Sequence, residues 1–200
     1  FNGKGQTIVI IDDGIQSSHP NFSGRVVYEF DFSDNDGIAF NKYMTHGTHV
    51  AGIAAGATTG IASEANIVML KVFSDYGNDD GSSIEKALQW VINNCDTYNI
   101  ASVNLSLGFQ DNNITANRGF LNDKFIALQS NGVFVCAASG NSFHEYLFPG
   151  IAYPAADPNV FSVGSTIISD IGAWGEHTTT DTDQISYYSQ RNETVLDVFA

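Results

Sequence analysis

Short apolar runs mark the expected strands of this chain, and a longer repeat of apolar positions marks its expected helices. Runs of about four to eight residues rich in Val, Ile and Phe, bounded by Gly, Asn or Asp, are typical of buried strands. Such runs predict strands at 7–12 (TIVIID), 66–73 (NIVMLKVF), 101–108 (ASVNLSLG), 133–141 (VFVCAASGN) and 159–166 (NVFSVGST).

Apolar residues that recur every three or four positions predict an amphipathic helix at 81–98. The recurring residues are Ile84, Ala87, Leu88, Val91, Ile92 and Cys95. Ser82 or Ser83 is expected to cap this helix. Further helices are predicted at 46–57, where small residues would allow close packing on a neighbour, and at 117–132.

Strands and helices that alternate in this way predict an α/β fold with three layers, in which helices flank a mostly parallel central sheet. Neither an internal repeat nor a linker to a second domain is visible in the sequence. The Thr- and Asp-rich stretch 176–184 is expected to form a solvated loop or hairpin. Polar side chains follow the ends of three predicted strands: Asp12 and Asp13, Ser106, and Asn141. Because ligands bind beyond the carboxyl ends of parallel strands, these side chains predict an active site there.

Composition and charge limit the partners of the chain. Its 200 residues are 43% hydrophobic and carry 8 Lys and Arg against 22 Asp and Glu, a net charge of −14. Phosphate binding needs clustered cations, so neither nucleic acid nor an anionic membrane is expected as a partner. No apolar run approaches the roughly 20 residues of a membrane span, and the leading FNGKGQ does not resemble a signal peptide. Cys95 and Cys136 lie in apolar segments and are expected to be free thiols rather than a disulfide.

Asp12 and His46 are the first candidates for chemistry. A carboxylate at the end of a strand can accept the Nδ1 hydrogen of an imidazole, which leaves the other ring nitrogen free to act as a general base. Paired aspartates at a strand end also bind magnesium in two-component receiver domains, and they occur in turns. By itself, IIDDG at 10–14 therefore leaves a catalytic acid, a metal site and a turn open.

Six sequence blocks narrow these alternatives. TIVIIDDGIQSSHPNF and HGTHVAGIAAG resemble the aspartate and histidine blocks of subtilisin-like serine proteases, the subtilase or peptidase S8 family, whose triad runs Asp, His, Ser. VNLSLG, FVCAASGN, YPAADPNVFSVGS and ISYYSQRNETVLDVFA are similar to later blocks of that family, in the same order. The resemblance covers nearly the whole chain and implies a subtilisin-like fold. A receiver domain, at about 120 residues, fits neither the length nor these blocks.

The resemblance implies catalytic roles for three residues. Asp12, the first residue of Asp-x-Gly, matches the aspartate that orients the histidine, and His46 matches the general base. Asn141 matches the side-chain donor to the oxyanion. By the same match, His49 is a structural residue of the helix, and Ser165 belongs to a structural strand and is not the nucleophile.

A substrate cleft is also implied by the resemblance. Residues that match the strand pairing with an extended peptide are Ser106, Leu107 and Gly108. Residues that match the opposite wall of the primary specificity pocket are Ala138, Ser139 and Gly140. The bond between Tyr153 and Pro154 matches one that is cis in the family.

Asp13 departs from the Thr or Ser usual in bacterial subtilisins, and DDGI is more like the kexin and furin branch, which cleaves after basic residues. Carboxylates that would favour a basic substrate, if they line the pocket, are Asp13, Asp75, Asp79 and Asp80. The alternative is that they are solvated loop residues. On either interpretation, Asp13 is expected to lie outside the triad.

A structural calcium ion is a further expectation, and no organic cofactor is implied. The loop 53–65 is shorter than the one that carries a calcium site in bacterial subtilisins, so that site is expected to be absent. Asp31, Asp34 and Asp36 offer oxygen ligands of the kind that calcium takes, and a solvated turn is the alternative.

The nucleophile block of the family, Gly-Thr-Ser-x-Ala, has no match in the chain. Residues 1–200 are therefore expected to be a peptidase domain truncated at its N-terminus and before the nucleophile serine, which would come from missing residues or a second chain. The 200 residues alone are predicted to be inactive. The alternative is a pseudoprotease that binds peptides without cleaving them. The resemblance implies peptide or protein substrates and an extracellular or periplasmic location.

Overall fold

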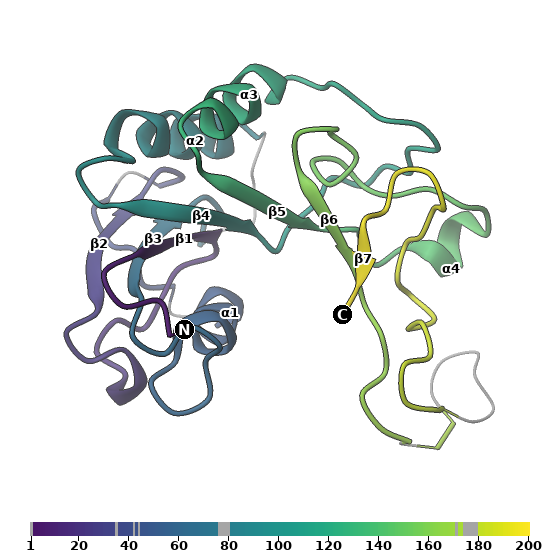
Figure 1. The fold of residues 1–200 in the computed structure, drawn as a ribbon, viewed down its shortest axis with the longest axis horizontal. Helices are drawn as coiled ribbons and strands as arrows, with labels where there is room; N and C mark the ends of the chain where they lie inside the picture. Colours follow the sequence, from purple (N-terminus) through teal and green to yellow (C-terminus); the bar gives the residue numbers. More distant parts are fainter. Residues whose placement is uncertain are drawn as a thin grey trace. The chain divides into compact units, whose positions relative to one another are not determined.

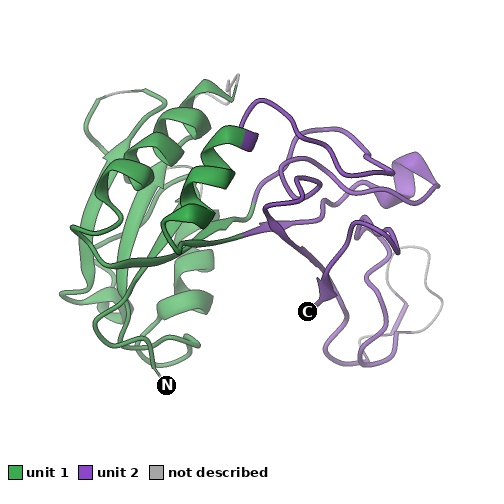
Figure 2. Cartoon of the chain, turned by 45° about the horizontal axis from the view of Figure 1, so that its top comes forward, with its two compact units in different colours: residues 1–106, 123–135 green, residues 107–122, 136–200 purple. Residues whose placement is uncertain are grey.

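The structure is a computed structural model that describes residues 2–34, 36–41, 43, 45–75, 81–170, 172–173 and 180–200. The chain forms two compact units, coloured separately in Figure 2. Unit 1 comprises residues 1–106 and 123–135, and unit 2 comprises residues 107–122 and 136–200.

Strands and helices alternate along the chain (Figure 1). The strands are β1 (Thr7–Asp12), β2 (Val26–Asp31), β3 (Asn66–Lys71), β4 (Ile100–Leu105), β5 (Phe134–Ala138), β6 (Phe161–Gly164) and β7 (Val198–Phe199). The α-helices are α1 (His46–Ala55), α2 (Ser82–Asn94), α3 (Asn122–Ser130) and α4 (Phe143–Tyr146), and a short 3-10 helix covers Pro20–Phe22.

The strands form one sheet in the order β2-β3-β1-β4-β5-β6-β7, and β5 runs from unit 1 into unit 2. The pairings β2–β3, β3–β1, β1–β4, β5–β6 and β6–β7 are parallel. Within unit 1, Figure 1 shows α2 and α3 on one face of the sheet and α1 on the other. The predicted α/β fold, with a parallel sheet between helices, is confirmed.

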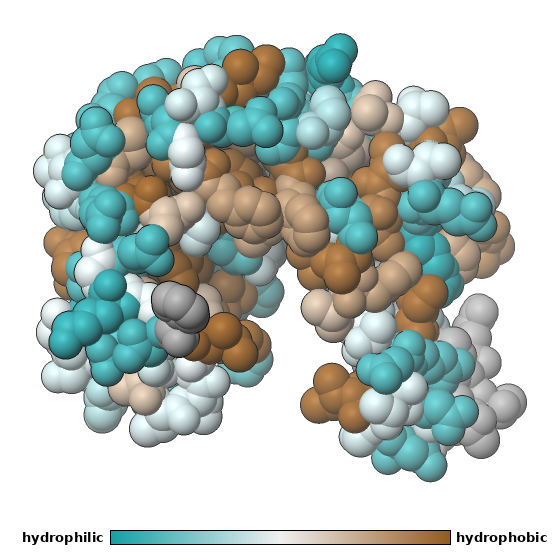
Figure 3. Space-filling model, in the orientation of Figure 1, coloured by the Kyte–Doolittle hydropathy of each residue, from teal (hydrophilic) through white to brown (hydrophobic). Residues whose placement is uncertain are grey.

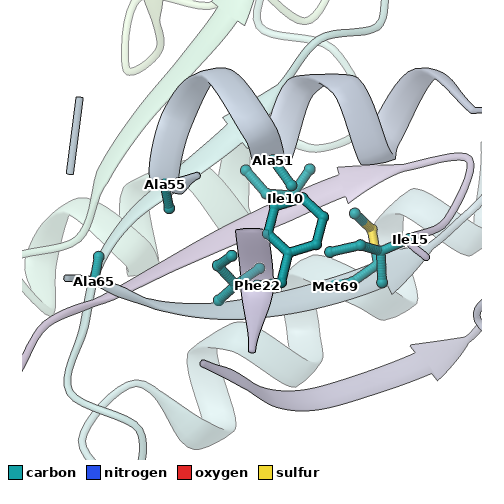
Figure 4. Close-up of a cluster of buried hydrophobic side chains, with 8 residues drawn as sticks. Ile10, Ile15, Phe22, Ala51, Ala55, Ala65 and Met69 are labelled. Carbon is teal, nitrogen blue, oxygen red and sulfur yellow. The ribbon is translucent and has the colours of Figure 1, made fainter. Parts of the chain in front are cut away.

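The core of unit 1 brings the start of α1 to the carboxyl end of β1. β1 lies between β3 and β4 and is buried on both faces, as central parallel strands are. On the α1 face, Ile10 and Met69 pack with Phe22 against the small side chains of Ala51 and Ala55 (Figure 4). Small residues let a helix approach a sheet closely, so this packing fixes the position of α1 over the strand that ends in the candidate carboxylates.

The amphipathic helix at 81–98 is confirmed as α2, but its predicted cap is wrong. The helix starts after Gly81, whose φ of 81° is left-handed, so a glycine and not a serine occupies the cap position. The Ser83 hydroxyl instead donates to the Phe32 carbonyl oxygen at 3.1 Å. That bond ties the first turn of α2 to the segment after β2, so the hydroxyl is not used within the helix. The helix ends at Asn94, four residues earlier than predicted.

Several other boundaries differ from the sequence prediction. β4 and β5 each end three residues before the predicted strands, at Leu105 and Ala138, and α3 begins at Asn122 rather than at 117. The strands β2 and β7 and the short helix α4 were not predicted. β2 lies at the end of the strand order, and its residues alternate between half-buried and exposed up to the buried Asp31.

Three local predictions are also resolved. Cys95 and Cys136 are free thiols, as predicted, and burial raises the pKa of Cys136. The Tyr153–Pro154 bond is cis, as the resemblance implied. Of the stretch predicted as a solvated loop or hairpin, 176–179 lies outside the described residues, Thr180 is buried, and 181–183 are exposed as predicted.

The described surface carries hydrophobic as well as hydrophilic residues, which lie side by side in the view of Figure 3. In unit 1, Ile53 of α1 and Ile61 beyond it are 58% and 83% exposed. No helix in the described part of the chain combines the length and the apolar character needed to cross a bilayer.

Candidate active site

Asp12 and His46 meet in unit 1, as the sequence predicted. Asp12 is the last residue of β1 and His46 the first of α1. Asp12 Oδ1 lies 2.8 Å from His46 Nδ1. The aspartate is fully buried, whereas 57% of the histidine side chain is exposed. The pair therefore combines a carboxylate shielded from water with an imidazole that a substrate can reach.

The geometry of this pair suits an oriented general base. A carboxylate oxygen facing Nδ1 holds the neutral ring in the tautomer protonated at Nδ1, which leaves Nε2 free to accept a proton. The hydrogen bond to Asp12 raises the pKa of His46, and burial of the ring partly opposes this effect. The Asp13 amide also donates to Asp12 Oδ1 at 2.8 Å, whereas Asp12 Oδ2 is buried without a hydrogen-bond partner among the described residues.

Asp13 does not lie in a solvated loop, which corrects one of the two interpretations of this residue. Its side chain is buried, with 1% of the residue exposed. Asp13 Oδ2 accepts a hydrogen bond from the His46 amide at 3.0 Å, and Oδ1 accepts one from the Gly47 amide at 2.6 Å. Burial raises the pKa of Asp13, while these two amides lower it. Both oxygens are thus occupied by the backbone of α1.

Lys71 is a buried cation that sequence reasoning missed. It ends β3 with 1% of its side chain exposed, and its Nζ lies 2.8 Å from Asp31, 2.9 Å from Asp34 and 3.2 Å from Asp75. Burial lowers the pKa of Lys71, but the carboxylates around its ammonium group together raise this pKa above its ordinary value. The available signal was a lysine inside the apolar run NIVMLKVF, since a lysine enclosed in a core requires carboxylate partners.

The carboxylates around Lys71 include residues that were predicted to bind calcium or to favour a basic substrate. Asp31 and Asp34 already surround an ammonium group, so the two carboxylates do not fit a calcium site at that place. The third candidate ligand, Asp36, accepts a bond from the Ile38 amide. Asp75 is paired with Lys71, and Asp79 and Asp80 lie outside the described residues. A structural calcium elsewhere in the protein stays a prediction.

Ser139, Gly140 and Asn141 lie in unit 2, directly after β5. The Ser139 amide donates to the Val163 carbonyl oxygen at 2.8 Å, and its hydroxyl donates to the Gln190 carbonyl oxygen at 2.7 Å. Gly140 has a left-handed φ of 106°, and a methyl group at this position would overlap the Gln190 side chain. Neighbouring segments thus fix the backbone before Asn141, whose side chain is exposed.

Gln190 holds this turn in place and was not predicted from the sequence. Its backbone N–H donates to the Gly140 carbonyl oxygen at 3.0 Å. Its side-chain Nε2 donates to the Asp111 carbonyl oxygen and to Asn112 Oδ1, at 3.0 and 2.8 Å. The residue is 2% exposed, and nothing in its sequence context distinguishes it from a surface glutamine.

The predicted substrate strand is divided between the units. β4 ends at Leu105, and the Ser106 hydroxyl accepts a bond from Asn104 Nδ2 at 2.9 Å in unit 1. Leu107 and Gly108 belong to unit 2, together with the predicted pocket-wall residues that begin with Ala138. The described geometry therefore places Asp12 and His46 in contact, and it locates the remaining predicted residues at the end of β5 and on the segments that follow β4 and β5.

Two further residues named from the sequence have local roles. His49 is exposed on α1, and its amide donates to the Thr45 carbonyl oxygen at 3.1 Å. Ser165 directly follows β6, and its hydroxyl lies 3.0 Å from the Ser186 hydroxyl and 3.2 Å from that of Tyr188. Ser165 therefore belongs to a network of hydroxyl groups in unit 2.

Comparisons with known proteins agree with the resemblance. Subtilisin-like protease 3 of Arthroderma benhamiae is 36% identical over 171 residues, which cover 84% of this chain and 40% of that protein. Subtilisin-like protease 9 of the same organism is 36% identical over 142 residues, covering 70% of this chain and 33% of that protein. A crystal structure of a cold-adapted subtilisin-like serine proteinase matches with a TM-score of 0.74 and 30% identity, and covers all of this chain and 64% of that one.

The chain thus spans less than half the length of these fungal relatives. The sequence model of the subtilase family, peptidase S8, matches residues 3–200. The chain belongs to the subtilase family.

Proposed function

We propose that these residues are part of a serine endopeptidase in which Asp12, His46 and Asn141 act on a peptide bond. The observation that carries the proposal is the 2.8 Å bond between the buried Asp12 carboxylate and Nδ1 of the half-exposed His46. The fungal relatives named subtilisin-like proteases, at 36% identity, support the same reaction class. The nucleophile of this proposal is a serine outside residues 1–200, on the rest of the polypeptide or on a second chain.

Proton transfer through His46 would couple the two halves of the reaction. As the serine oxygen bonds to the substrate carbonyl carbon, its proton passes to His46 Nε2, and Asp12 stabilises the resulting imidazolium. The carbonyl oxygen becomes an oxyanion, which the Asn141 side-chain amide would stabilise by donating a hydrogen bond. His46 then gives the proton to the leaving amine, and water attacks the acyl-enzyme by the same path.

The proposal is tested on the complete polypeptide with a peptide library and a serine-directed phosphonate. We expect hydrolysis that the phosphonate blocks, a loss of about 10⁴-fold in kcat for Asp12→Asn and a loss of at least that size for His46→Ala. Asn141→Ala should reduce kcat by about 100- to 1000-fold. Full activity of the His46→Ala protein would exclude this mechanism.

A pseudoprotease is the other outcome of this experiment. In that case the complete protein would bind extended peptides with no turnover, and the phosphonate would label no serine. We also propose an extracellular or periplasmic location, which would be contradicted if the protein, and the activity, were confined to the cytoplasmic fraction of its cell.

A further inference from the structure

The two consecutive carboxylates at the end of β1 hold different parts of the same histidine. Asp12 bonds to the ring of His46 through Nδ1. Asp13 bonds to the backbone, accepting from the amides of His46 and of Gly47 at 3.0 and 2.6 Å. His46 is therefore fixed at its side chain by the last residue of β1 and at its main chain by the residue that follows.

Asp13 takes the place of a helix cap. The first amides of an α-helix have no partner within the helix, and a side chain just before the helix usually accepts from them. In α1 that position is Thr45, whose side chain makes no capping bond. The carboxylate of Asp13, 33 residues earlier in the chain, accepts from the first two amides instead. Its negative charge also lies at the end of the helix where the helix dipole stabilises an anion.

The packing around Gly47 shows how closely α1 approaches these carboxylates. A methyl group at Gly47 would lie 3.0 Å from Asp12 Cβ and 3.0 Å from Asp13 Oδ1, and it would overlap the Gly14 carbonyl oxygen. Gly14 itself has a left-handed φ of 122°. The two glycines therefore permit the close contact through which a strand end can cap the helix.

We propose that Asp13 is a positioning residue for His46: it anchors the start of α1 so that Nδ1 meets Asp12 and Nε2 faces the substrate. This inference rests on the proposed function, in which His46 is the general base. It differs from a role of Asp13 in recognising basic substrates, because both carboxylate oxygens are bonded to the backbone of α1 and the residue is 1% exposed. Displacement of a catalytic group by about 1 Å can cost about 100-fold in rate, so an anchor of this kind should appear in kcat.

The anchor should also appear in the pH dependence of the reaction. The charged groups that act on Asp13 are Asp12, its neighbour on β1, and His46 on α1. Both carboxylates favour the imidazolium form of His46, with Asp12 as the main contributor. Removing the charge of Asp13 lowers the pKa of His46. Because a general base must be neutral, the acidic limb of the rate profile should then move to lower pH.

The test uses Asp13→Asn and Asp13→Ala in the complete polypeptide. Asn is nearly the same shape but keeps one acceptor, whereas Ala keeps none. We expect kcat to fall by about tenfold for Asn and about 100-fold for Ala, with KM within about twofold of the parent. The acidic limb should shift to lower pH in both variants, because both remove a negative charge that favours the imidazolium. Asp96→Asn is the control, since it removes an exposed carboxylate beyond α2 and should change neither quantity.

Folded protein is quantified by circular dichroism, so that a loss of stability is not taken for a loss of rate. If Asp13→Ala does not fold, Asp13→Asn alone decides. An unchanged kcat in folded Asp13→Asn overturns the inference, and so does a lower kcat with the acidic limb unmoved, because that pattern indicates a structural role only. If His46→Ala keeps full activity, the proposed function itself fails. If His46→Ala is inactive while the Asp13 variants match the parent, only the positioning role fails.

Discussion

Three buried charges lie in one row across the carboxyl ends of three neighbouring strands, and Asp13 is a fourth buried charge beside this row. Asp12 of β1 is the register partner of Lys71 of β3, and Lys71 is the register partner of Asp31 of β2. Asp13 follows Asp12. A buried charge is costly unless it is paired or hydrogen-bonded, and each of these four residues has such a partner: His46 for Asp12, the α1 amides for Asp13, and one another for Lys71 and Asp31. At this scale, the candidate site and its support belong to one arrangement of charges.

Lys71 is predicted to be the most important single residue for stability in this row. Lys71→Met leaves Asp31, Asp34 and Asp75 without their shared ammonium group. Removing one partner of a buried ion pair typically costs about 3 to 5 kcal/mol in the free energy of unfolding, which urea denaturation of the complete protein would measure. The control is Lys124→Met, whose partners Asp123 and Glu85 are exposed, and which should leave the midpoint unchanged within error. Equal effects of the two substitutions would contradict the role of burial.

The contribution of Lys71 and its carboxylates to the free energy of unfolding should decrease at low pH. A hydrogen bond from the Ser74 hydroxyl is the main cause that lowers the pKa of Asp34 to about 2. Burial opposes ionisation of Asp31, but bonds from Lys71 and Ser33 lower its pKa overall. Lowered pKa values in the folded state mean that the stabilisation is present above the ordinary value of 3.8 and is lost as the pH falls towards 2.

The difference in urea midpoint between the parent protein and Lys71→Met should therefore be constant from about pH 7 to pH 5 and shrink between about pH 4 and pH 2. Midpoints measured in a series of buffers at constant ionic strength provide this comparison. A difference of the same size at about pH 2 and at pH 7 would show that the carboxylates are not the partners that matter.

At the scale of elements, the hydrophobic pattern predicted the central strand β1 correctly. It failed for elements at the edge of the sheet and for helix starts whose bonding partners lie far away in the sequence. The central strand β1 was predicted with its observed bounds because it is apolar on both faces. β2 was missed although VVYEFD has the alternation of a half-exposed strand. The cap of α2 was wrong because two serines stood in the favoured place, while a left-handed Gly81 starts the helix. The Asp13 cap of α1 comes from 33 residues away, and no local pattern predicts that contact.

In the candidate site too, some residues were predicted from the sequence and others were missed. Asp12 and His46 were predicted from the resemblance to the subtilisin-like family, and the bond between their side chains is present. Asp13, which bonds to the start of α1, Lys71, which pairs with three carboxylates, and Gln190, which holds the turn before Asn141, were assigned another role or none. Their roles depend on burial and on hydrogen bonds across the sheet or between loops, which single-sequence reasoning does not supply.

Two glycines of α1 provide a test of how the helix packs. A methyl group at Gly47 would overlap the Gly14 carbonyl oxygen, whereas one at Gly52 would meet no described atom within 4 Å. Gly47→Ala should therefore lower the free energy of unfolding by about 1 to 3 kcal/mol and reduce kcat. Gly52→Ala should be neutral or stabilising by up to about 1 kcal/mol, because Ala favours the helix. Thermal unfolding of both variants measures the contrast, and equal losses would mean that close packing at Gly47 is not the cause.

At the scale of the whole molecule, the chain is a family member that spans only part of its relatives. It matches the family model over residues 3–200 but covers 40% of the length of one fungal relative and 64% of the cold-adapted proteinase chain. The family resemblance assigns the nucleophile to a block with no match here. Acyl transfer needs a nucleophile whose proton the general base removes. Without that nucleophile, the Asp12–His46 pair has no group to activate.

We therefore predict that residues 1–200, expressed alone, do not hydrolyse peptides. The physical reason is that the Asp12–His46 pair can accept a proton only from a group positioned at Nε2, and in the proposed mechanism that group is a serine outside residues 1–200. The measurement is fluorogenic peptide hydrolysis by purified residues 1–200, with the His46→Ala variant as the background control. Turnover that exceeds this control and is blocked by a serine-directed phosphonate would show that a serine within the 200 residues is the nucleophile. Restoration of turnover by adding the remaining part of the polypeptide would place the serine there and complete the triad.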